Sequence, residues 1–461
     1  MQDEMLIDEY SEENDILSAR IGFIDSCLLL LLGGILTYLS VVDMGVKGVL
    51  LVILLVIVIS MLRASNIILV WLTIMYNPTL VSGIPIFKVN VAISILMLII
   101  YRKISVSRLM NSATIGLFGF LLYLLFTIIF SPDPIKALDA YSIYAKSFVV
   151  MLIFMSVIVT EEEFGRVLKW WAVVAALSII PAWVHYLLGP NTWLYHAFYE
   201  LSGSKDVAKG SVNIGREVIG RLVWAGVDAN GRGAMLMFPF GLALAFFSVT
   251  RFKNKLFWGV VLGSITICIL GSFSRSAFMS MCIIVFLYAL LINIRALLPM
   301  FFMGVVAMLA IFFIPQIRDR IIGIPESIIA TGASGRLGFW KLALSRWTES
   351  PLLGNGLRDF VITFQHEVHN SYIELLTDGG LIAFSVFCVL LFLACHWAFQ
   401  SSKLYYNLHP MFSKSIFCGM VGMCAMIGTV MFAQNMILWL SFAACYILYF
   451  NSVNSGEFEA S

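Results

Sequence analysis

The sequence predicts an all-α, polytopic integral membrane protein, on the evidence of its composition, its long apolar runs and its loop charges. Of its 461 residues, 61% are hydrophobic and 12% are charged, and the mean hydropathy is +0.95. Soluble proteins contain only about 45–50% apolar residues. The apolar runs are continuous rather than alternating, which excludes the strands of a membrane β-barrel. Because a spanning helix needs about 20 apolar residues, we expect about 12–14 transmembrane helices.

Fourteen candidate spans can be distinguished along the chain. They lie near residues 21–42, 46–62, 66–80, 85–101, 112–130, 141–160, 167–188, 230–249, 256–272, 277–293, 297–314, 373–397, 415–432 and 435–450. The third is short and contains Pro78. The acidic segment Met1–Ala19 lacks the basic start of a secretory signal, so no cleavage is expected. All eight cysteines fall in apolar runs, which predicts packing residues rather than disulfides or metal ligands.

Basic residues in the loops predict the orientation of these spans. With a cytoplasmic N-terminus, the inner loops carry twelve Lys and Arg residues, which agrees with the positive-inside rule. The short outer loops then hold only Lys47, Lys136 and Arg275. We therefore expect one integral domain, residues 1–461, with two long polar outer loops at residues 189–222 and 315–371. Long loops in compact folds are usually functional or disordered.

Three arginines are candidates for binding an anion at the outer face. Arg221 precedes the span that contains Asn230, Arg275 lies in a short turn, and Arg336 opens an expected helix in the second loop. We predict that this helix lies on the membrane surface with one apolar stripe facing the lipid. The stripe consists of Leu337, Trp340, Leu344 and Trp347. An arginine beside a span can equally be an interfacial anchor, and this alternative stays open for each of the three.

His369 is the candidate proton acceptor. It is followed by Asn370 and Ser371, where the twelfth span begins. A helix N-terminus with free backbone N–H groups is a natural anion site. Histidine has an unperturbed pKa near 6.5, so it is mostly neutral at pH 7 and can accept a proton. An anion site, several arginines and a base on one face suit a reaction with a pyrophosphate leaving group.

Other chemistries have little support in the sequence. There is no Asp-x-Asp motif, no phosphate-binding P-loop and no His-Glu-x-x-His zinc motif. The acidic residues of the outer loops are scattered, so we expect no metal site and no cofactor. We expect the protein to contact membrane lipids and not to bind nucleic acid. A transporter or flippase remains an alternative, although no paired halves with ionisable groups at the midplane are evident.

Four segments of the chain resemble the superfamily of O-antigen ligases and Wzy-type O-antigen polymerases. They lie across residues 215–400: Arg221–Asn230; Ser274–Ser276; Gly335–Leu357; and His369–Gly380. The sequence pattern of the ligases matches this chain at His369, Asn370 and Gly380. The chain departs from that pattern at Ala383. Alanine is small enough to preserve close helix packing, yet the departure slightly favours polymerase over ligase.

The resemblance implies a GT-C-like, metal-independent, inverting glycosyltransferase of the bacterial inner membrane, working at its periplasmic face. The substrates would be an undecaprenyl-pyrophosphate-linked glycan and an acceptor, either a lipid-linked repeat unit or lipid A–core. A flippase and a chain-length regulator are the implied partners. The resemblance assigns pyrophosphate binding to Arg221, Arg275 and Arg336, and activation or orientation of the acceptor hydroxyl to His369. Asn230, Asn370 and Gly380 would support the site.

Overall fold

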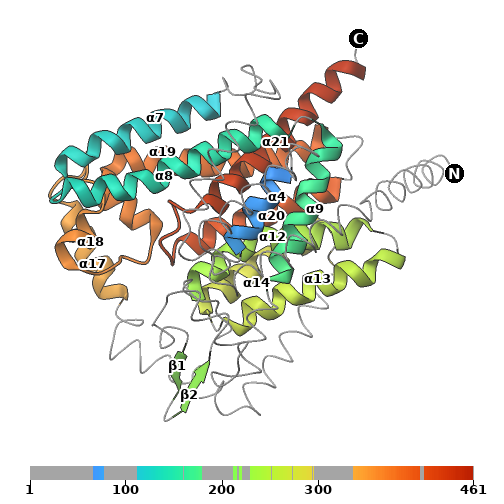
Figure 1. Cartoon of the computed structure of the whole chain (residues 1–461), viewed down its shortest axis with the longest axis horizontal. Coiled ribbons are helices and arrows are strands. Elements are labelled where there is room, and N and C mark those ends of the chain that lie inside the picture. Colours follow the sequence, from blue (N-terminus) through green and yellow to red (C-terminus); the bar gives the residue numbers. More distant parts are fainter. Residues whose placement is uncertain are drawn as a thin grey trace, which may run out of the picture.

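The computed structural model of the chain is a bundle of helices with one small hairpin (Figure 1). It describes residues 66–76, 112–158, 160–178, 211–214, 217–220, 229–250, 252–272, 274–292, 294, 336–404 and 410–459. The helices are α4 (Asn66–Tyr76), α7 (Ser112–Thr127), η2 (Ile128–Phe130), α8 (Pro134–Val157), α9 (Glu161–Leu177), α12 (Ala229–Val249), α13 (Phe252–Gly271), α14 (Arg275–Leu291), α17 (Arg336–Trp347), α18 (Asp359–Phe364), α19 (Ser371–Leu404), α20 (Pro410–Ile427) and α21 (Met436–Glu459).

These helices confirm the predicted class, a polytopic helical membrane protein. Among the described residues, five helices are long and apolar enough to cross a membrane, namely parts of α8, α12, α13, α19 and α21. The helices α7, α14 and α20 are apolar but shorter. The candidate spans near residues 21–42, 46–62, 85–101 and 297–314 lie outside the described residues. The expected total of 12–14 spans therefore stays a prediction.

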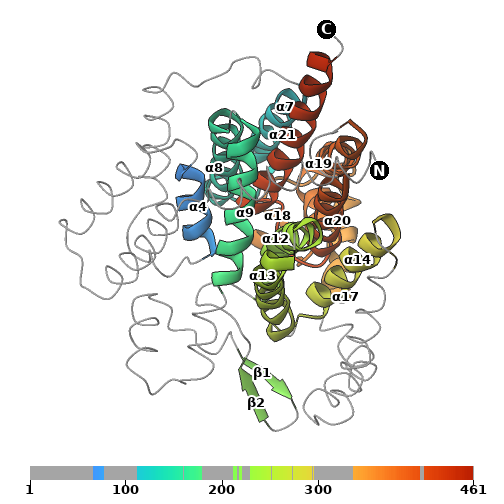
Figure 2. The ribbon, with the colours of Figure 1, turned by 90° about the vertical axis from the view of Figure 1, so that its right-hand side faces the viewer.

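The expectation of an all-α chain needs one addition. Strands β1 (Ser211–Ile214) and β2 (Glu217–Gly220) form an antiparallel pair in which Ser211 lies opposite Gly220. This hairpin belongs to the first long polar segment, residues 189–222, and in two perpendicular views it lies apart from the described helices (Figures 1 and 2). The strands are too short to change the class of the fold.

Helix α20 is the central element of the described bundle. It packs against α12, α14 and α19, and α21 packs in turn against α19 and α8. Where α12 and α20 cross, a Cβ atom on Gly241 would lie 2.6 Å from the Cα atom of Gly419. Small residues let helix backbones approach closely, which is a common way to pack helices in membranes. The glycines thus fix α12 against α20 at this crossing.

A buried arginine holds three helix ends together at one end of the bundle. The guanidinium of Arg232, which is 1% exposed, donates hydrogen bonds to Tyr76 O at the end of α4 (3.4 Å) and Ser178 O just after α9 (2.8 Å). Carbonyl groups at helix C-termini lack partners within the helix and carry a partial negative charge. Arg232 is not among the residues predicted from the sequence. Helix α4 belongs to the third candidate span, residues 66–80. The contacts of Arg232 show that α4 ends beside the end of α9 and the start of α12 (Figure 2).

The predicted surface helix forms, but its apolar stripe is divided. Trp340 donates through Nε1 to Val368 O (3.0 Å) and packs against a small core that contains the buried Ala343. Leu337 and Leu344 are exposed by 40% and 39%. The prediction of a single lipid-facing stripe was therefore wrong. Helix α17 packs against α19, so Trp340 faces the protein interior while Leu337 and Leu344 remain exposed.

We predict that Arg232→Ala lowers the stability of the protein by about 2–4 kcal/mol, because it leaves buried carbonyl groups without their charged donor. The measurement is thermal unfolding of the purified chain in detergent. Lys255→Ala is the matched control, because this exposed lysine lies near the start of the neighbouring helix α13. Equal melting temperatures for the two variants would show that Arg232 does not hold the helix ends.

Candidate functional site

The first two sequence motifs meet where α12 and α14 begin. The hydroxyl of Ser274 donates a 2.7 Å hydrogen bond to Asn230 Oδ1, and Ser274 also caps α14 by accepting from Ala277 N (3.3 Å). A Cβ atom on Gly233 would overlap the Cβ atom of Ala277. Asn230 and the turn before Arg275 are therefore in direct contact, although they are 44 residues apart in the chain.

Arg275 is the first residue of α14, and it is exposed. A cation at a helix N-terminus is opposed by the positive end of the helix dipole, by about 0.3–1 kcal/mol. Helix stability therefore does not account for an arginine at this position.

The last two motifs meet on the turn that follows α20, residues 428–435. Arg336, at the start of α17, donates through Nη1 to Thr429 O (3.1 Å). Ser371, at the start of α19, donates to Val430 O (2.8 Å) and accepts from Phe432 N (2.7 Å) and Ala433 N (3.2 Å). One short turn thus holds the starts of both helices.

The end of α20 joins these two groups of residues. A Cβ atom on Gly233 of α12 would meet Met426 Cε at 3.4 Å. The carbonyl of Met426 in turn accepts hydrogen bonds from Thr429 N (3.0 Å) and Thr429 Oγ1 (2.8 Å). The chain of contacts runs from the start of α12 through α20 to the residue that binds Arg336. We call this end of the bundle the site end.

His369 is fixed between two anchored residues. Val368 before it is buried, with its carbonyl bonded to Trp340, and Asn370 after it is 8% exposed. His369 has a φ of 54°, an uncommon value for a residue with a side chain, which often marks functional sites. Its side chain is 38% exposed, and Nδ1 lies 3.5 Å from Glu367 Oε2. The imidazole is thus accessible, with a carboxylate beside one nitrogen.

The expectation of free backbone N–H groups at the start of α19 was wrong. The side chain of Asn370 accepts hydrogen bonds from Tyr372 N (3.0 Å) and Ile373 N (3.1 Å), as N-cap residues do. Glu374 N donates to Asn370 O (2.9 Å). Asn370 therefore caps the helix and occupies two of the N–H groups at its start.

Gly380 breaks α19 and receives a loop from the third motif. Its φ of 65° and ψ of −164° are not helical, and a Cβ atom there would overlap Leu352 O. Two backbone hydrogen bonds join the loop to the break in the helix. Asn355 N donates to Thr377 O (2.9 Å), and Leu381 N donates to Pro351 O (2.9 Å). Only glycine fits so close to another backbone. Gly380 thus fixes the second polar loop against α19, and the small residue Ala383 is fully buried nearby.

Sequence reasoning missed a group of charged residues beneath this loop. Asp359 is fully buried and binds Arg346 through two hydrogen bonds, of 2.9 and 3.0 Å, which raise the pKa of the arginine. Arg358 donates its backbone N–H to Asp378 Oδ2 (2.8 Å), and its Nη1 atom lies 3.8 Å from Glu374 Oε1. A signal was present in the sequence. Glu374 and Asp378 are acids four residues apart in a predicted span, and ionisable residues within a span are usually functional or paired.

The structure therefore brings five of the seven candidate residues to the site end. These are Asn230, Arg275, Arg336, His369 and Asn370. Gly380 lies about two and a half turns further along α19, beneath the loop, and Arg221 lies outside the described residues. The site end is defined by a histidine and two arginines at or beside three helix starts. This is a membrane protein with a basic, histidine-containing site at one end of its helices.

Comparison with known proteins agrees with this class. Residues 260–388 match the family model described as O-antigen ligase (Wzy_C), a family of glycosyltransferase-type membrane enzymes. The match spans α14, α17, α18 and the first half of α19, and so includes Arg275, Arg336 and His369. Members of that family transfer glycans in the manner of O-antigen ligases and polymerases, and their substrates are lipid-linked glycans. None of the curated proteins compared with the chain matches it.

We predict that Gly380→Ala unfolds or misassembles the second polar loop, because the added methyl group overlaps Leu352 O. Thermal unfolding and limited proteolysis of the purified protein measure this effect. Gly263→Ala is the matched control, since a Cβ atom on Gly263 in α13 meets nothing within 4 Å. If Gly380→Ala were as stable and as protease-resistant as Gly263→Ala, the close approach at the break would be contradicted.

Proposed function

We propose that the chain transfers a glycan from undecaprenyl pyrophosphate to an acceptor hydroxyl at the site end. The observation that carries the proposal is that Arg275, Arg336 and His369 lie at or beside helix starts that contacts link to the end of α20. The family match supplies the reaction class. The geometry supplies what the reaction needs, which is cationic groups for a leaving pyrophosphate and an accessible base for an attacking hydroxyl.

In the proposed reaction, the acceptor oxygen attacks the anomeric carbon from the face opposite the pyrophosphate. The new C–O bond forms as the bond to the pyrophosphate breaks, and its electron pair leaves with the pyrophosphate. The proton of the hydroxyl passes to His369, directly or through a water molecule. This displacement inverts the anomeric centre. A positioned base typically contributes a factor of about 10²–10⁴ to such a rate.

Arginines suit the leaving group for two reasons. A guanidinium binds phosphate oxygens bidentately, and fixed charges near lipid act in a medium of lower dielectric constant than water. We assign this role to Arg275, with Arg221 as a second contributor. Arg336 already binds Thr429 O through Nη1 and so holds the turn after α20. We therefore assign it a smaller part in pyrophosphate binding.

The acceptor defines whether the chain is a polymerase or a ligase. The departure from the ligase pattern at Ala383 favours a Wzy-type polymerase, whose acceptor is a second lipid-linked repeat unit. Transfer to lipid A–core is the alternative. In either case we place the site end at the periplasmic face, where a flippase delivers the donor and a chain-length regulator acts on the product.

We predict that His369→Ala lowers transfer by about 10²–10⁴-fold and leaves protein level and donor binding close to normal, because it removes the base but not the arginines. His366→Ala is the matched control, since this exposed histidine lies nearby and makes a tilted ring contact with Phe339. In cells lacking the wild-type gene, a failed polymerase leaves single repeat units on the lipid carrier. A failed ligase leaves full-length polymer there. Normal long-chain glycan in the His369→Ala strain would refute the assignment of His369.

We predict that Arg275→Ala abolishes detectable transfer and weakens donor binding, whereas Arg275→Lys restores only part of the activity. An ammonium group keeps the charge but lacks the planar, two-pronged geometry of guanidinium. Transfer by purified protein at several donor concentrations measures both effects. Equal activity of Arg275→Ala and wild type would show that Arg275 is only an interfacial anchor.

We predict that a cysteine replacing Gln365, which is exposed near the site end, reacts with a membrane-impermeant maleimide in intact spheroplasts. A cysteine replacing Lys255, at the opposite end of the bundle, should react only after lysis. The parent chain without either replacement controls for native cysteines. The reverse pattern would place the site end in the cytoplasm and would exclude the periplasmic reaction.

A further inference from the structure

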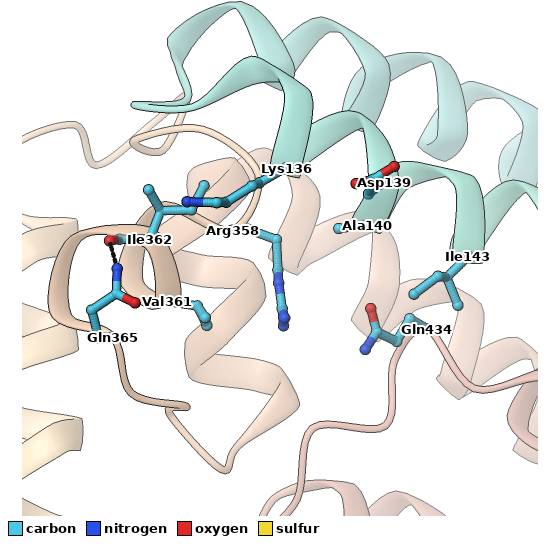
Figure 3. Close-up of a pocket in the computed structure, with 9 residues that line it drawn as sticks. All are labelled: Lys136, Asp139, Ala140, Ile143, Arg358, Val361, Ile362, Gln365 and Gln434. Carbon is cyan, nitrogen blue, oxygen red and sulfur yellow. Dashed lines mark hydrogen bonds between the residues drawn. The ribbon is translucent and has the colours of Figure 1, made fainter. Parts of the chain in front are cut away.

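A cleft of about 310 Å³ lies between the start of α8 and the segment that carries α18 (Figure 3). Its walls are Lys136, Asp139, Ala140 and Ile143 of α8, then Arg358, Val361, Ile362 and Gln365 in and beside α18, and Gln434 after α20. This volume is at the small end of the range of about 300–1,000 Å³ that is typical of ligand pockets. The cleft therefore suits a small unit rather than a long chain.

The cleft is lined by both hydrogen-bond donors and acceptors, with aliphatic groups between them. Lys136 and Arg358 are donors, Asp139 is an acceptor, and Gln365 and Gln434 can do both. The aliphatic surface comes from Ala140, Ile143, Val361 and Ile362. A sugar ring matches this lining, because each hydroxyl both donates and accepts while the C–H groups present small apolar faces. A phosphate would favour an all-basic lining, and a lipid tail would favour an all-apolar one.

Arg358 lines the cleft with a side chain that is 25% exposed. Figure 3 shows its side chain extending into the space between Val361 and Gln434. Its Nη1 atom is buried and has no hydrogen-bond partner among the described residues, since Glu374 Oε1 at 3.8 Å is too distant for one. Its backbone is fixed in a left-handed conformation, with a φ of 64° and a bond to Asp378. The cleft wall thus carries a cationic side chain that is partly exposed and whose backbone is held in place.

The cleft is connected to the proposed reaction site by the turn after α20. Gln434 on the cleft wall follows Ala433, whose N–H binds Ser371 two residues after His369. The hydroxyl of Ser147 on α8 also binds Gln434 O (2.9 Å), which fixes this wall to α8. The cleft and the histidine are therefore attached to the same short turn, residues 428–435.

We propose that this cleft is a sugar-binding subsite that holds one ring of a glycan substrate while transfer takes place at the site end. The inference rests on the glycan-transfer function proposed above. The ring could belong to the donor or to the acceptor, since both present the same hydroxyl chemistry. In either case, the subsite contributes to substrate affinity and not to the chemical step.

The test uses the double variant Lys136→Ala/Gln365→Ala in the full chain, purified in lipid nanodiscs. Both residues are exposed on the cleft rim, and the Lys136 ion pair with Asp133 (3.1 Å) is a surface pair of little energetic value. The fold should therefore persist. Lys341→Ala on α17 is the matched control, because this exposed lysine is not part of the cleft.

Initial rates are measured with lipid-linked substrate extracted from cells that lack the gene, and the acceptor is varied separately by supplying glycan that lacks the pyrophosphate-linked lipid. We expect the double variant to raise one KM by about 5- to 50-fold with kcat within twofold of wild type. A raised KM for donor assigns the ring to the donor, and a raised KM for acceptor assigns it to the acceptor. Unchanged KM values, or a loss confined to kcat, would overturn the subsite.

A second variant tests the subsite without removing any polar group. Ile362→Trp adds bulk at the cleft wall and should raise the same KM if the ring lies there. Thermal unfolding confirms that each variant is folded. If the wild-type chain itself transferred no glycan, the proposed function would fail. If wild type were active and the rim variants were indistinguishable from it, only the subsite would fail.

Discussion

The buried hydroxyl of Ser371 is the interaction on which the arrangement of the site end depends. It makes three hydrogen bonds to the turn after α20, donating to Val430 O and accepting from Phe432 N and Ala433 N. A turn buried at a helix end has backbone groups that need partners, and this one hydroxyl supplies three of them. Because Ser371 begins α19, the same bonds fix the residues just before it, including His369.

The turn after α20 also explains how motifs that are distant in the sequence come together. Arg336 binds it on one side, and Gln434 at its far end lines the cleft beside α8. The packing of α20 against α12 and α14 brings Arg275 to the same end. A lipid-linked substrate suits this construction, since its pyrophosphate lies where spanning helices end and its glycan extends beyond the membrane.

The sequence predicted the helical class and the residues of the site end better than it predicted their contacts. Long apolar runs are required by the lipid environment, so composition and run length were sufficient to predict the helical membrane class. Asn370 and Gly380 were identified by pattern, but only the structure shows that one caps α19 and the other receives a loop. Arg232 and Arg358 were missed because their partners are backbone groups or residues far along the chain. Such pairings depend on how helices pack, which one sequence does not specify.

The central claim is that a leaving pyrophosphate binds at the site end, against Arg275 and within reach of His369. The most direct measurement is a structure of the full chain in nanodiscs, determined by electron cryomicroscopy with undecaprenyl pyrophosphate bound. We predict pyrophosphate density beside the Arg275 guanidinium, on the side of α20 where the turn of residues 428–435 lies. Density at the opposite end of the bundle, or between helices away from both residues, would contradict the account.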